Sequence, residues 1–120
     1  MKLVQYVTFF DDAKTIGGDQ LSDLHFPFDA PGADPESRSI LLFKMNPIGQ
    51  ATQLRIRLNN NPHFVEKQFL PTQIGDFRSF HELVNKGFLK AQNNELVVSV
   101  SSGGKVVVSD FVLMYKENVA

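Results

Sequence analysis

The stretch that decides the fold is residues 93–115, NNELVVSVSSGGKVVVSDFVLMY. It contains two runs rich in β-branched and aromatic residues, 96–100 and 105–108, and the second continues to Tyr115. Ser-Ser-Gly-Gly stands between them, and paired glycines supply the positive φ that tight hairpin turns need. The stretch therefore predicts a β-hairpin, and its apolar residues require a sheet to be built around them.

Composition sets limits on the class of protein. The chain has 120 residues, which fits one domain over residues 1–120. Its 12 Lys and Arg oppose 13 Asp and Glu, so it lacks the basic surface that nucleic acid or an anionic membrane would attract. Cysteine is absent, which excludes disulfides, thiolate metal sites and a cysteine nucleophile.

The chain starts with a charge at Lys2 followed by apolar residues up to Phe10, but Gln5 and Thr8 interrupt this run and no small-residue cleavage site follows. We expect a strand there, not a signal peptide. No apolar run approaches the roughly 20 residues that cross a bilayer. A soluble, cytoplasmic protein is therefore the expectation.

Five further segments have the composition of strands. Within 53–59 the alternation is strict, so Leu54, Ile56 and Leu58 are expected to face inward while Arg55 and Arg57 face solvent. The segment 39–45 has apolar residues at both odd and even positions, which face opposite sides of a strand. This pattern indicates an interior strand covered on both faces. The five segments are 2–10, 24–28 with Pro27 at a sheet edge or a bulge, 39–45, 53–59 and 64–70. Loops are expected at 11–23, 29–37 and 72–76 and a turn at 46–49.

One segment has two interpretations. Ser79 and Glu82 match a capping box, and Gly87 stands where a helix would end, so 80–86 can form a short helix. A strand over 77–83 fits the same residues. With either outcome the chain is predicted to be an all-β antiparallel β-sandwich, a jelly roll of about eight strands with at most one short helix.

From Leu54 onward the chain resembles the second half of a galactose-binding-domain-like jelly roll, a superfamily that includes carbohydrate-binding modules. The likeness covers residues 54–115, and it is carried by LRIRLN at 54–59, GFLK at 87–90 followed by NNELVVSV at 93–100, and VVSDFVL at 107–113. It implies a non-catalytic, lectin-like module that binds carbohydrate or another ligand through loops at one end. The chain departs from the pattern at Ala91 and Gln92, where a second glycine is usual, and it lacks Trp; the usual sugar platform of an exposed Trp or Tyr is not expected.

Asparagines cluster in two of the expected turns. Amide side chains both donate and accept hydrogen bonds, as a polyhydroxylated ligand requires. The simpler interpretation is that asparagine occurs in turns because it adopts turn conformations readily. The candidate ligand-binding residues, expected at one end together with 29–37, are Asn59, Asn60, Asn61, His63, Asn93 and Asn94.

No metal site, cofactor or catalytic motif is predicted. Asp11, Asp12, Asp19 and Asp23 have oxygen ligands suited to a structural calcium, but their spacing matches no known calcium loop, so a solvated acidic loop is favoured. The three histidines form no metal-binding pair, and no nucleophile motif occurs. Asp110 is expected to mark a β-bulge or turn rather than a ligand.

Two classes of function remain after these exclusions. The first is a binding or accessory module that engages a saccharide or a protein partner. The second is a structural subunit of a homo-oligomer or larger particle, since 11 Phe may be too many for one domain to bury. An enzyme is the minority interpretation.

Overall fold

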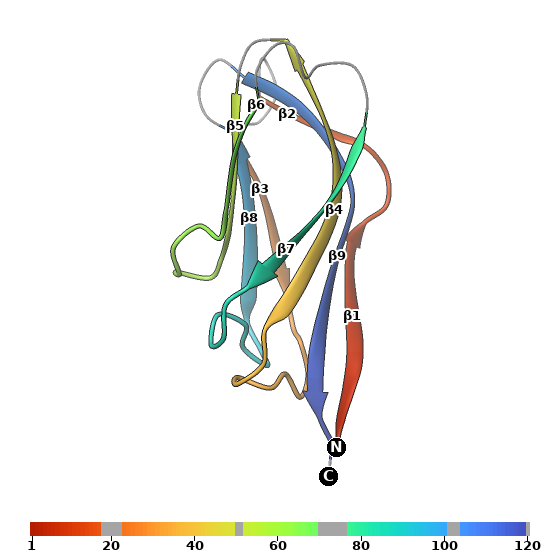
Figure 1. Ribbon diagram of the computed structural model, residues 1–120, viewed down its shortest axis with the longest axis vertical. Coiled ribbons are helices and arrows are strands. Elements are labelled where there is room, and N and C mark those ends of the chain that lie inside the picture. The colour runs from red at the N-terminus through yellow and green to blue at the C-terminus, as the bar shows by residue number, and fades with distance from the viewer. Residues whose placement is uncertain (18–22, 50–51, 70–76, 101–103, 120) are drawn as a thin grey trace.

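The structure is a computed structural model that describes residues 1–17, 23–49, 52–69, 77–100 and 104–119 (Figure 1). Within these ranges the chain forms nine strands and no helix, and thus no helix able to cross a membrane. The strands are β1 Lys2–Phe10, β2 Lys14–Gly17, β3 Asp23–Phe28, β4 Ser39–Gly49, β5 Thr52–Leu58, β6 Val65–Phe69, β7 Arg78–Val84, β8 Asn94–Val100 and β9 Gly104–Asn118.

The strands build two antiparallel sheets that face each other. One sheet has the order β1-β9-β4-β7, with β2 also paired to β9. The other has the order β3-β8-β5-β6. Figure 1 shows the two layers and places both termini at one end, where the Val119 amide donates to the Met1 carbonyl at 3.0 Å. The predicted all-β antiparallel sandwich is confirmed.

The predicted hairpin is wrong. The strands β8 and β9 follow one another in the chain but lie in opposite sheets, since β8 pairs with β3 and β5 while β9 pairs with β1, β2 and β4. Both strands bury an apolar face against the same core, which two adjacent hairpin strands of one sheet would also do. The turn predicted at 101–103 lies outside the described residues. The sheet that each run joins is determined by the other strands.

The strand β9 changes its pairing at Asp110. This residue has a φ of 55°, and the ladders with β1 and β4 both shift in register beside it. The inserted residue keeps Val106 and Val108 before it and Phe111 and Leu113 after it on the buried face. The expectation of a bulge at Asp110 is confirmed.

Residues 78–84 form the strand β7, so the helix interpretation of this segment is wrong and the strand interpretation holds. The strand pairs with β4, with Phe80 opposite Phe43. Its burial alternates, with Phe80, Glu82 and Val84 less exposed than their neighbours. A sheet edge that could accept a strand outweighed the local capping box.

Two loop and turn boundaries also differ from expectation, and a third cannot be compared. The strand β2 lies inside the segment expected as a loop at 11–23. Its Ile16 is fully buried, and the strand pairs with residues 105–108 of β9. The strand β4 continues through Asn46 to Gly49, where a turn was expected. The loop expected at 72–76 lies outside the described residues.

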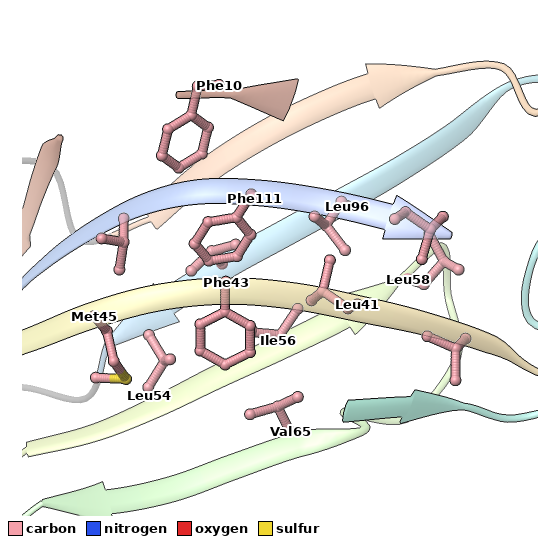
Figure 2. Close-up of a cluster of buried hydrophobic side chains, with 14 of the residues drawn as sticks. Phe10, Leu41, Phe43, Met45, Leu54, Ile56, Leu58, Val65, Leu96 and Phe111 are labelled. Atoms are coloured by element: carbon pink, nitrogen blue, oxygen red, sulfur yellow. The ribbon is translucent and has the colours of Figure 1, made fainter. Parts of the chain in front are cut away.

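Phenylalanine rings cross the core from one sheet to the other. Phe26, Phe10, Phe111, Phe43 and Phe80 form a run in which neighbouring rings stack with centroids 5.0–5.4 Å apart. Figure 2 shows Phe10, Phe111 and Phe43 in a column, with residues of β5 around them. Among these, Leu54, Ile56 and Leu58 are fully buried as expected. The large number of Phe thus serves mainly as core filler.

Candidate functional site

Three connections meet at one end of the sandwich, which we call the loop end: 29–38 after β3, 59–64 after β5 and 85–93 after β7 (Figure 1). The Ala30 amide donates to the Ala91 carbonyl at 3.0 Å, which joins the first connection to the third. The Asn59 amide donates to the carbonyl of Glu95, at the start of β8, at 2.8 Å. The structure therefore brings the two asparagine clusters and the 29–37 segment together.

Asn59 holds two of these connections to each other. Its φ is 59°, a left-handed conformation that asparagine tolerates better than most residues. Its side-chain Nδ2 donates to the Phe88 carbonyl at 2.8 Å and to Asn94 Oδ1 at 3.0 Å, and its Oδ1 accepts from the Glu95 amide at 2.9 Å. The Asn59 side chain is thus committed to the turn.

Asn61 and Asn94 are committed in the same way. Asn61 Nδ2 donates to the Leu58 carbonyl at 2.8 Å. Asn94 is 2% exposed, and its amide closes the 90–94 turn by accepting from the Lys90 amide at 2.9 Å and donating to the Lys90 carbonyl at 2.6 Å. These side chains offer a ligand little without breaking hydrogen bonds of the fold.

Asn60, His63 and Asn93 differ because all three are exposed. No hydrogen bond joins their side chains to any other residue that the structure describes. Asn93 has a φ of 58°, and its backbone amide donates to Asp29 Oδ1 at 2.9 Å. These three are the candidate residues whose polar side chains remain available to a partner.

A hollow of about 260 Å³ lies at the loop end between β3 and the start of β8. Its size approaches the lower bound of about 300 Å³ typical of small-molecule sites. Asp29 contributes a carboxylate there, and Pro27 and Phe28 contribute apolar surface. The lining residues are Pro27, Phe28, Asp29, Asn93 and Asn94.

Among the described residues, the acidic side chains do not assemble into a metal site. Asp12 lies 3.9 Å from Lys14, and Asp23 Oδ2 lies 3.0 Å from His25 Nε2, while Asp19 falls outside the described residues. Within the described ranges no three His, Asp or Glu are close enough to hold a metal ion. The hydrogen bond to Asp23, with a smaller contribution from Glu95, raises the pKa of His25.

No protein-family model matches the chain, and no curated protein matches it in sequence. Solved structures do match its fold. Dimeric latent PorU of Porphyromonas gingivalis superimposes on 93% of this chain with a TM-score of 0.64 at 12% identity, and the match covers 13% of the PorU chain.

The C-terminal CBM6 of LamC, a marine laminarinase of Zobellia galactanivorans, matches over 94% of this chain and 99% of its own with a TM-score of 0.57 at 10% identity. The CBM22-1 and GH10 modules of xylanase 10B from Clostridium thermocellum match over 92% of this chain and 26% of theirs, with a TM-score of 0.51 at 9% identity. The chain shares the jelly-roll β-sandwich fold of these structures. At these identities the likeness concerns the fold alone.

An exposed Trp or Tyr was not expected in this jelly roll, but the structure has an exposed Tyr. Tyr6 on β1 is 61% exposed on the outer face of the β1-β9-β4-β7 sheet. A smaller hollow of about 80 Å³ lies near it, lined by Val4, Arg38, Ile40, Met114, Tyr115 and Lys116. The expected absence of an exposed Trp or Tyr is therefore wrong, because burial of a lone Tyr depends on strand neighbours that the local sequence does not reveal.

Sequence reasoning placed the segment 29–37 at this end but did not single out Asp29 as a candidate, and it missed Phe28 and Pro27. The signal that could have found them is the position of Asp29 directly after an edge strand that contains a proline. Asp29 approaches Asn93 across 64 positions of the chain, and no sequence period connects the two.

Proposed function

We propose that this jelly roll is a non-catalytic module that binds a saccharide in the hollow at the loop end. The observation that carries the proposal is the hollow itself, which places the Asp29 carboxylate and the Asn93 amide beside the apolar Phe28 and Pro27. The shared fold supports it, since one matching structure is a CBM6 and another contains CBM22-1 and was solved with xylohexaose.

The chemistry of the hollow suits a sugar. Hydroxyl groups need strong acceptors and a donor, which Asp29 and Asn93 supply, while the C–H face of a pyranose needs apolar contact, which Phe28 and Pro27 supply. Asn60 and His63 are exposed on the adjoining turn and would contact further units of a longer ligand. Asn59 and Asn61 are hydrogen-bonded within the turns and would not contact the ligand, and the Asn94 side chain is committed to the 90–94 turn.

Binding without catalysis is part of the proposal. Retaining and inverting glycosidases both use a pair of facing carboxyl groups, whereas Asp29 is the single acid among the described residues that line this hollow. Two of the matching structures belong to larger proteins, of which this chain spans 13% and 26% of the length. The chain is therefore proposed as an accessory module.

Titration calorimetry against soluble β-glucans and xylans tests the proposal, with a matched pair of variants. Asn93→Gly removes the side chain at a φ of 58°, where glycine fits without strain, so the fold should be kept while affinity falls. Asp29→Asn keeps an acceptor for the Asn93 amide but loses the charge, and should weaken binding by about tenfold or more.

The control variant is Asn59→Gly, which removes three hydrogen bonds from an equally left-handed residue. It should lower the free energy of unfolding by about 1–3 kcal/mol and leave affinity within about threefold at a temperature where the variant is folded. Binding that survives Asn93→Gly and Asp29→Asn but is lost in Tyr6→Ala would move the site to the sheet face. No binding to any glycan would refute the proposal.

A further inference from the structure

Most edges of the two sheets carry features that discourage pairing with another chain. Natural sandwiches protect edges with proline, charges, short strands or inward-pointing ionic residues. The edge strand β3 contains Pro27, and β6 has five residues including Lys67. Lys67 Nζ of β6 pairs with Glu82 of β7, an edge strand of the other sheet, at 2.6 Å. The edge strands β6 and β7 thus share a half-buried ion pair between the sheets.

The edge strand β1 lacks such protection. It has nine residues, contains no proline, and pairs on one side with β9, while no other described strand pairs with its second side. Its one charged residue, Lys2, stands at its start and forms an ion pair with Asp34. Leu3, Val4 and Tyr6 are 45%, 52% and 61% exposed along this edge.

The outer face behind this edge is apolar as well. Tyr6 lies opposite Met114, Met114 opposite Ile40, and Ile40 opposite Leu83, so one row of apolar residues crosses all four strands. The other sheet differs, because the row of Asp23, Ser99, Arg55 and Glu66 across its outer face is polar. A strand added to β1 would extend the apolar row and cover its exposed Tyr6.

We propose that β1 pairs antiparallel with β1 of a second copy, which joins two of these sheets into one continuous sheet about a two-fold axis. Self-pairing fits β1 because residues 3–10 carry no charge, so no like charges stand opposite each other. Lys2, the exception, is neutralised by Asp34. This interface goes beyond the saccharide site, which lies at the loop end.

The geometry of the pair is constrained by symmetry. Facing side chains of an antiparallel pair point to the same side of the sheet. With a two-fold axis perpendicular to the sheet, one residue must therefore face its own counterpart, and the axis passes midway between the two. In a pairing that uses most of β1, that residue lies among Val4, Gln5, Tyr6 and Val7. Its two Cα atoms would be about 4.5–5.5 Å apart, within the span of a disulfide.

Sedimentation velocity tests the proposal over roughly 1–100 µM, the range expected for a small interface. The wild-type mass should rise from the 13.5 kDa of one chain toward twice that value. Tyr6→Lys should remain monomeric, while Leu83→Lys, which alters a residue 53% exposed on the far edge of the same sheet, should dimerise like the wild type. A wild type that stays monomeric throughout overturns the proposal, and so does loss of the dimer in both variants, which would indicate face-to-face packing.

Cross-linking provides a second test, because the chain has no cysteine. Single-cysteine variants at positions 4, 5, 6 and 7 are oxidised, with Leu83→Cys as the control. One of the four should form a disulfide dimer at least tenfold faster than the control. Equal rates, or faster cross-linking at position 83, overturn the proposal.

Discussion

At the scale of single residues, the same side chain serves different purposes according to its neighbours. Asn59 and Asn93 both adopt left-handed backbone conformations, with φ of 59° and 58°. The side-chain amide of Asn59 makes three hydrogen bonds. Asn93 is exposed, and it is its backbone amide that donates to Asp29. Residue type alone could not separate the structural asparagine from the available one.

Asp34 is the residue whose titration should govern acid stability. It is buried and accepts hydrogen bonds from Lys2 Nζ, Ser37 Oγ and the Glu36 amide. The Lys2 hydrogen bond above all, with the other two donors, holds the pKa of Asp34 far below its usual range. The stabilisation is therefore present above the unfolded-state pKa of about 4 and is lost as the pH falls below it.

We predict that Asp34→Asn flattens the dependence of unfolding free energy on pH between about 5 and 2. Lys2→Gln should flatten it less, because the hydrogen bonds from Ser37 and Glu36 remain. Urea denaturation across that pH range measures both effects. Parallel curves for the wild type and Asp34→Asn would contradict the assignment.

At the scale of elements, β9 organises the first sheet. Its lower part pairs with β1, its upper part with β2, and β4 follows it on the other side. The bulge at Asp110 allows this, since it lets both halves of β9 bury their apolar residues. The strand β2 must approach closely where β9 begins, and Gly17 is placed there.

Gly17 should therefore tolerate substitution less well than Gly87, although both have positive φ. A Cβ at Gly17 would lie 2.1 Å from the Gly104 carbonyl oxygen, whereas a Cβ at Gly87 meets no atom within 4 Å. We expect Gly87→Ala to cost about 1–2 kcal/mol from backbone strain and Gly17→Ala about 2–5 kcal/mol. Chemical denaturation of the two variants measures the difference, and equal losses would disprove the steric explanation.

At the scale of the whole molecule, the stacked rings join the sheets. Phe111 contacts Phe10 on one side and Phe43 on the other, each with a centroid separation of 5.0–5.1 Å, and it is fully buried. The run reaches Phe26 of the opposite sheet through Phe10. Loss of the middle ring would leave a cavity and interrupt contact between strands from both sheets.

We predict that Phe111→Ala lowers the free energy of unfolding by about 3–5 kcal/mol. The matched control is Phe77→Ala, at a residue 47% exposed, which should change stability by no more than about 0.5 kcal/mol. Thermal unfolding followed by circular dichroism compares them. A Phe111→Ala variant as stable as the control would show that the ring run contributes little.

The sequence by itself determined the all-β class, the inward face of Leu54, Ile56 and Leu58, the end of β5 at Asn59 and the bulge at Asp110, because alternation and turn chemistry are local properties. Only the tertiary structure decided that β8 and β9 enter opposite sheets and that residues 78–84 are extended. It also decided that Asp29 meets Asn93. Periodicity reports that a face is buried, but the identity of the strand that covers it depends on pairing between segments distant in the chain.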